Sequence, residues 1–244
     1  MKKILLAITM LLTFAIQGQE AIKLRVQYNE GDSYLMKVVT SQDMGAIMAN
    51  SFTVQMIMDI VGKEGENFLT ESKFKNVSME MVQGGKTINY NSDTPEDQLD
   101  DVGKMMKLQM DPMMKALVKA TISPRGESSN LTVVPANAMQ AGDFANQNGV
   151  VYPEKAVKVG DSWDSSREAN NVTLNTTHTV SEITSDTVKL EVTGKASGMA
   201  TGTISGYVNI NRANGIPRES KVVVKMDVMG QSVLTEAIVT IEKM

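Results

Sequence analysis

The sequence predicts a mainly β protein, built as a curved antiparallel sheet or open half-barrel of about 10–12 strands with one amphipathic helix packed on it. Three features of the 244 residues support this fold class. β-branched residues, which pack well on a pleated sheet, are abundant, with 26 Val and 20 Thr against 14 Leu. Apolar and polar residues alternate over several stretches. The turns between these stretches are too short for the crossovers that parallel strands need.

The expected strands are clearest where the alternation is longest. Residues 22–28, 52–60 and 222–228 each place apolar side chains on one face and polar side chains on the other. Asn214-Gly215 is the strongest short hairpin signal, because both residues tolerate a positive φ angle. Strands are expected to resume near Val150 and to continue to the C-terminus.

A different period marks residues 95–114 as the helix. Apolar residues recur there at steps of 3, 4, 4 and 3, which places them on one helical stripe. They are Leu99, Val102, Met106, Met110 and Met113, and the stripe is widened by Met105 and Leu108. Thr94 is a suitable N-cap, and Pro95 suits the first helical position.

The first residues predict where the protein works. Residues 1–18 combine two lysines with an apolar run of the length found in the core of a signal peptide. We expect residues 19–244 to form a single β-rich domain, with an irregular connection over about 135–149, and no transmembrane segment after cleavage. The protein is therefore expected in the periplasm or outside the cell. It is not expected to be a lipoprotein, because it has no cysteine to carry a lipid.

The composition excludes several classes of function. The formal charge of −4 argues against a nucleic-acid-binding surface, which needs a net basic face. Without cysteine there is no thiolate zinc site, iron–sulfur cluster or disulfide framework, and a single histidine cannot build a multi-histidine metal site. The common hydrolase, nucleotide-binding and zinc-protease motifs do not occur. We therefore expect no enzyme, no cofactor and no resident metal.

Two groups of residues could suggest chemistry but have simpler interpretations. His178 lies in a polar strand segment without a serine nucleophile motif, which favours an ordinary strand histidine. The acidic residues near the helix start lie where the helix dipole favours negative charge, and they lack the spacing of a calcium loop. They are Glu96, Asp97, Asp100 and Asp101. A carboxylate pair assembled only by the fold remains an alternative.

The run from Pro153 to Trp163 reads Pro-Glu-Lys-Ala-Val-Lys-Val-Gly-Asp-Ser-Trp. It resembles a motif of an uncharacterised family of exported β-rich proteins common in Bacteroidota, and the order of strands and helix extends this resemblance over most of the processed chain. The resemblance implies no catalytic residues. The layout is similar to the lipoprotein-carrier class, in which a curved sheet holds an apolar ligand under a helical lid. Within the run, Gly160 and Asp161 are expected to form a tight turn, with Trp163 as a structural anchor beneath it.

Methionine is unusually frequent, with 19 Met against 5 Phe. Three interpretations of the helix methionines stay open: they fill the core, they form a pliable wall around an apolar ligand, or they bind Cu(I) through Met106, Met110 and Met114. The second interpretation defines a candidate methionine wall. Its residues are Met105, Met106, Met110, Met113, Met114, Phe52 and Met56.

Together these observations predict an exported, non-catalytic protein that binds an apolar ligand, such as a lipid or a lipoprotein acyl chain, in the cell envelope. The alternative is a structural or protein-interaction domain whose sheet is filled by its own side chains. The sequence names no protein partner.

Overall fold

The computed structural model describes residues 21–45, 48–138, 141–142, 150–169, 172–198, 200–228 and 231–244. The signal peptide predicted over residues 1–18 lies outside these ranges, and so does most of the connection predicted over 135–149. The described part of that connection contains a 3-10 turn, η3 (Ala136–Ala138).

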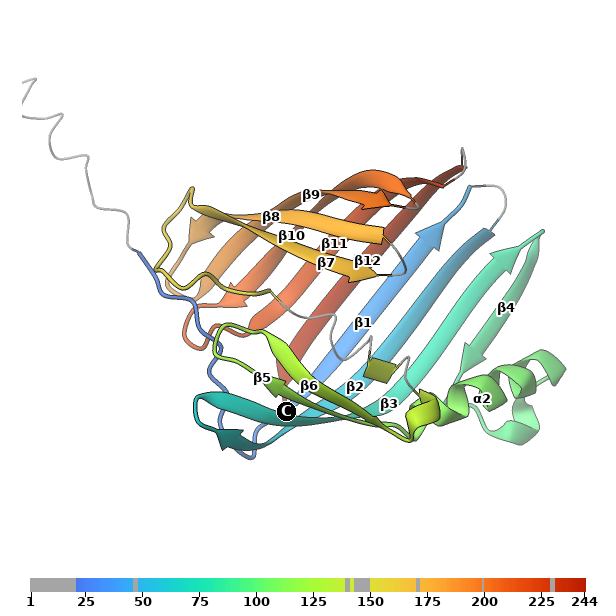
Figure 1. Cartoon of the computed structure of the whole chain (residues 1–244). Coiled ribbons are helices and arrows are strands. Elements are labelled where there is room, and N and C mark those ends of the chain that lie inside the picture. The colour runs from blue at the N-terminus through green and yellow to red at the C-terminus, as the bar shows by residue number, and fades with distance from the viewer. Residues whose placement is uncertain are drawn as a thin grey trace, which may run out of the picture.

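Within the described residues, twelve strands form one antiparallel sheet that is not closed (Figure 1). They are β1 (Ser33–Asp43), β2 (Met48–Glu64), β3 (Asn67–Gln83), β4 (Lys86–Asn91), β5 (Leu117–Ile122), β6 (Ser128–Val134), β7 (Ser162–Ala169), β8 (Val172–Ile183), β9 (Thr187–Gly198), β10 (Thr201–Asn211), β11 (Pro217–Val228) and β12 (Gln231–Lys243). The order across the sheet is β6-β5-β3-β2-β1-β12-β11-β10-β9-β8-β7, and β4 pairs with β3. The predicted mainly β class is therefore confirmed.

Hairpins between consecutive strands build most of the sheet, and one long-range pairing joins its two halves. β1 pairs with β12 over ten residues on each strand, from Tyr34 opposite Lys243 to Asp43 opposite Leu234. This pairing places the first and last strands in the middle of the sheet. The strands predicted over residues 52–60 and 222–228 lie within β2 and β11.

Glycines allow the sheet to bend sharply at β9 and β10. A Cβ atom at Gly194, Gly202 or Gly206 would lie only 2.1–2.2 Å from a carbonyl oxygen of the neighbouring strand. The adjacent backbones therefore approach more closely than a side chain would permit, a common role of glycine within strands. The sheet curls beyond this bend, so that β7 and β8 turn back in front of β10–β12 (Figure 1).

The core occupies the inner face of the sheet, as strand alternation requires. Opposite pairs on β1 and β2, Met36 with Met56 and Val38 with Val54, bring large apolar side chains together. All four are at most 2% exposed. Because successive side chains point to opposite faces, the residues between them lie on the outer face.

The strand predicted over residues 22–28 is wrong, because these residues form an extended segment outside the sheet. Their backbone bonds go to separate parts of the chain: Ile22 pairs with Val157, Val26 N donates to Pro124 O at 2.8 Å, and Gln27 N donates to Asn214 O at 2.8 Å. The expected alternation of burial is still present, because the segment packs one side against the core. Alternation of apolar and polar residues therefore indicates that one side of a segment is buried. It does not show that the segment is hydrogen-bonded into a sheet.

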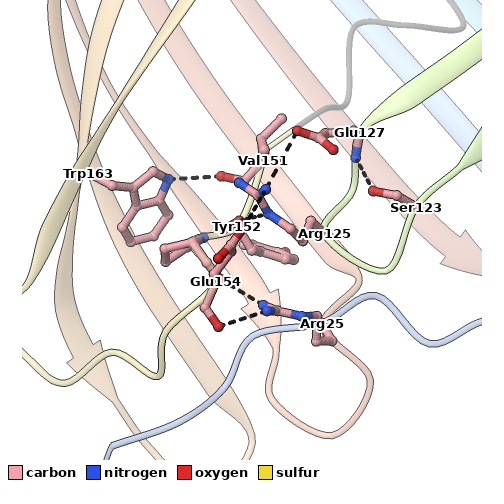
Figure 2. Close-up of polar contacts among 9 residues, drawn as sticks. Arg25, Ser123, Arg125, Glu127, Val151, Tyr152, Glu154 and Trp163 are labelled. Atoms are coloured by element: carbon pink, nitrogen blue, oxygen red, sulfur yellow. Dashed lines mark hydrogen bonds and ion pairs between the residues drawn. The ribbon is translucent and has the colours of Figure 1, made fainter. Parts of the chain in front are cut away.

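A group of arginine contacts holds this segment against residues 150–157 at one end of the half-barrel (Figure 2). The Arg25 guanidinium donates to the carbonyl oxygens of Pro153, at 2.8 Å, and Glu154, at 2.9 Å. Arg125 Nε donates to Tyr152 O at 2.7 Å. The buried Tyr152 hydroxyl then donates to Gly215 O at 2.7 Å, which ties the group to the β10–β11 hairpin.

That hairpin exists as predicted, but its turn is different. β10 and β11 are paired, yet β10 ends at Asn211 and β11 begins at Pro217, so the loop is longer than two residues. Of the Asn214-Gly215 pair, Gly215 has a positive φ of +66°. The Asn214 side chain instead accepts a hydrogen bond from Ile216 N at 3.1 Å, a local bond that asparagine often makes in turns.

The helix α2 (Asp101–Met114) packs against β3 and β4 and lies beside that part of the sheet (Figure 1). It begins at Asp101 and not at Pro95, because Asp100 is the N-cap: its carboxylate accepts a hydrogen bond from Gly103 N at 2.7 Å. A 3-10 turn, η2 (Glu96–Gln98), precedes it. Among the described residues, no helix is long and apolar enough to cross a membrane.

The buried side of α2 is narrower than the predicted stripe. Gly103, Met106 and Met113 are buried. Met105 and Leu108, expected to widen the stripe, are 56% and 75% exposed. The reason is tertiary: the main contacts of α2 with the sheet are at the β3–β4 corner, so the sheet covers only part of the helix.

Candidate ligand-binding pocket

A pocket of about 410 Å³ lies in the inner face of the C-terminal half of the sheet. We call it the concave pocket. It is lined by Thr40, Val150, Ser165, Arg167, Leu174, Thr176, His178, Val192, Val208, Pro217, Glu219, Ser220, Val222, Val224, Thr235, Ala237, Val239 and Ile241. Its volume falls within the range of about 300–1,000 Å³ that is usual for small-molecule sites.

Strand register explains why these side chains share one surface. Val222 on β11 lies opposite Ala237 on β12, and Ala237 lies opposite Thr40 on β1. On the other side of the glycine bend, His178 on β8 lies opposite Val192 on β9. The curl of the sheet therefore makes two walls, one from β7 and β8 and the other from β11, β12 and β1.

The walls are mainly aliphatic, and this distinguishes the concave pocket from two wider hollows in the described surface. A hollow of about 650 Å³ beside η2 is lined mostly by hydroxyl, amide and acidic side chains, such as Ser51, Asn89 and Asp100. Another, of about 850 Å³, is lined by polar residues of β7–β9. The residues around both hollows are mostly polar, unlike the valine-rich lining of the concave pocket. In the described residues, no three acidic or histidine side chains gather as a metal site.

Two residues that line the concave pocket each carry a buried polar atom without a hydrogen-bond partner. The atoms are His178 Nδ1 and Thr235 Oγ1. His178 is only 8% exposed. Burial lowers the pKa of His178 from its ordinary value near 6.5, and the Asp164 carboxylate opposes this change only in part. The imidazole is therefore uncharged at neutral pH.

Trp163 supports His178 from the edge of the sheet. The two residues face each other on β7 and β8, and their rings stack at 5.6 Å between centroids with 13° between planes. The indole Nε1 donates to Val151 O at 2.9 Å (Figure 2). Gly160, with φ of +90°, and Asp161 form the turn before β7. Trp163 is half-buried, so Trp163→Ala should cost less than the 3–5 kcal/mol, roughly, that is typical of a fully buried tryptophan.

The candidate methionine wall lies elsewhere in the described structure, and none of its seven residues lines the concave pocket. Met56 and Met113 belong to the core, while Phe52, Met110 and Met114 are partly buried against it. Met106 is 9% exposed and Met105 is 56% exposed. Whether these residues meet a ligand stays a prediction about another part of the molecule.

The sequence gives little indication that the lining residues of the concave pocket form a site. Valine and threonine at alternate positions of 220–224 and 235–241 indicate strands with an apolar face. That pattern is the same whether the face is packed by another element or left open. The one distinctive signal is His178, the single histidine, and its polar strand segment predicts only an ordinary strand residue.

Fold and pocket thus define an open antiparallel half-barrel with an apolar hollow on its inner face. A family of unknown function, DUF6263, matches residues 141–217, a range that includes the Pro153–Trp163 run and both Trp163 and His178. No curated protein matches the chain.

One solved structure, described as "Lipid-protein interactions in lipovitellin", is similar to this chain with a TM-score of 0.56 and 9% sequence identity. The alignment covers 89% of this chain and 25% of that one, so the chain spans about a quarter of its length. At this identity the likeness concerns the fold alone. A structure of MucB in complex with MucA(peri) aligns over 86% of this chain and 89% of that one at 11% identity, but its TM-score of 0.14 supports no argument.

Proposed function

We propose that this protein binds one apolar ligand, a lipid or a lipoprotein acyl chain, in the concave pocket, without catalysis. The observation that carries the proposal is the pocket itself: about 410 Å³ of space between two mainly aliphatic walls of the curled sheet. Open apolar surface of this kind is usually a ligand groove or an interaction site.

The driving force follows from the lining residues. Moving an apolar chain from water onto aliphatic surface contributes roughly 25 cal/mol for each Å² of apolar area removed from water. Aliphatic side chains also adapt to ligands without needing polar partners, which suits a class of ligand more than a single compound. The likeness to lipovitellin supports the proposal, since that structure concerns lipid–protein interactions.

The cell envelope is the proposed location, supported by the signal-peptide pattern of residues 1–18. An exported lipid binder needs a protected apolar site in an aqueous compartment, and a half-barrel can provide one. A non-catalytic role is supported by the lack of recognised catalytic motifs in the sequence.

A pair of variants on β12 tests the proposal. Ala237→Phe would place a ring in the concave pocket, whereas Leu234→Phe places a ring on the opposite face of the same strand, where Leu234 is 39% exposed. We expect Ala237→Phe to reduce uptake of a fluorescent fatty acid at least tenfold while Leu234→Phe binds as the wild type does. Melting curves of both variants control for folding.

Native mass spectrometry of protein purified from its own host provides the second measurement. A copurifying lipid that is lost in Ala237→Phe supports the proposal. Empty wild-type protein that also excludes the fluorescent probe would favour the alternative, a structural or interaction domain.

A further inference from the structure

The two residues with an unpartnered buried polar atom line opposite walls of the concave pocket. His178 is on β8 and Thr235 is on β12, with three strands between them in the sheet. Within the described chain, these two residues provide the buried side-chain atoms that lack a hydrogen-bond partner. Buried polar groups are nearly always paired, so an unpaired one indicates a missing partner such as a ligand or a water.

We infer that the ligand is an uncharged amphipathic lipid, with an apolar chain along the valine-rich walls and a hydroxyl or carbonyl oxygen that pairs with His178 or Thr235. This inference rests on the proposed function. A threonine hydroxyl donates one hydrogen bond, and a neutral imidazole can donate from one nitrogen and accept at the other. An alcohol or ester oxygen can satisfy either group.

The charges at the pocket argue against an ionised ligand. Two lining residues carry charge, Arg167 and Glu219, and they have opposite signs. Arg167 is exposed on the edge strand β7, where water screens it. A carboxylate placed among the valines would lose its hydration without gaining a buried cation, which is unfavourable.

Thr235→Val provides the decisive change, because it removes the hydroxyl and keeps the shape of the side chain. Thr176→Val is the matched control, since the Thr176 hydroxyl also lines the pocket but already donates to Ser165 O at 3.4 Å. His178→Phe is the second test variant, and it keeps a ring to stack on Trp163. Melting temperatures without ligand establish that each variant folds.

The ligands are 1-decanol, decane and decanoate, each used to displace the fluorescent probe N-phenyl-1-naphthylamine from the processed chain. The readout is the ratio of the decanol Kd to the decane Kd. A change that weakens binding of both apolar chains equally cancels in this ratio. We expect this ratio to rise about two- to tenfold in Thr235→Val or His178→Phe, the worth of one hydrogen bond. It should stay at the wild-type value in Thr176→Val.

Three results would overturn the inference. An unchanged ratio in both test variants would mean that the polar atoms do not meet the ligand, although the proposed function would stand. Tighter binding of decanoate than of decanol, lost in Arg167→Gln, would mean that the pocket selects anions. If neither the probe nor any of the three compounds binds, the proposed function fails and the inference fails with it.

Discussion

Replacing Gly215 with alanine tests how the N-terminal segment is fastened to the sheet. Gly215 has a φ of +66°, and a Cβ atom there would lie 2.1 Å from Arg25 O and 2.5 Å from Arg25 C. These are backbone atoms, so the segment itself must move. The left-handed conformation costs an alanine about 1–2 kcal/mol, and forcing extra volume into a packed site costs about 1–3 kcal/mol. We therefore expect Gly215→Ala to lower the free energy of unfolding by about 2–5 kcal/mol.

Gly65→Ala separates these two costs. Gly65 has nearly the same φ, +62°, but nothing lies within 4 Å of its Cβ position. Gly65→Ala should lower the free energy of unfolding only by the conformational cost, about 1–2 kcal/mol. Part of this cost is offset because alanine makes the unfolded chain less flexible.

Urea titration gives both free energies, and each 1 kcal/mol should lower the melting temperature by about 2–4 °C in a chain of this size. Hydrogen exchange at Gln27, whose N–H donates to Asn214 O at 2.8 Å, reports on the segment directly. Equal losses in the two variants, with unchanged protection at Gln27, would refute the reasoning.

Three further predictions follow from burial and charge. Tyr152→Phe should cost about 1–3 kcal/mol in urea titration, because it removes the donor to the buried Gly215 carbonyl; no loss would contradict this. Met113→Ala should cost about 2–5 kcal/mol, whereas Met105→Ala should stay within about 0.5 kcal/mol; similar costs would show that α2 is packed differently. Because burial lowers the pKa of His178 in the folded protein, the unfolded chain binds a proton at His178 at a higher pH than the folded protein does. Between pH 7.5 and 5 the free energy of unfolding of the wild type should therefore fall more than that of His178→Phe. Parallel pH profiles of the two proteins in urea titration would contradict this prediction.

The β class and the antiparallel order were predictable because they depend on local patterns. Alternation over 52–60 and 222–228 requires one buried face, and short turns allow only hairpins between neighbours. The C-terminal end of the helix at Met114 was also predicted correctly. Its beginning was not, because Thr94 and Asp100 are both good N-caps and only the fold selects between them.

Residues 22–28 show the limit of periodicity. Their alternating burial is real, but their hydrogen bonds go to three separate loops, and loop positions are set by contacts distant in sequence. The candidate site was missed for a similar reason. Methionines on a helix attract attention as a possible ligand wall, whereas the residues of the concave pocket, such as Val222 and Ala237, resemble any sheet interior.

The sequence alone predicted the β class, the strands over 52–60 and 222–228 and the region of α2, because each depends on neighbours along the chain. Tertiary structure decided where the sheet bends, since Gly194, Gly202 and Gly206 matter only through the carbonyl oxygens opposite them. It also decided which apolar face is filled and which is left open. Space between two walls is a property of strands far apart in sequence, and no local pattern records whether a side chain faces a packed neighbour or a cavity.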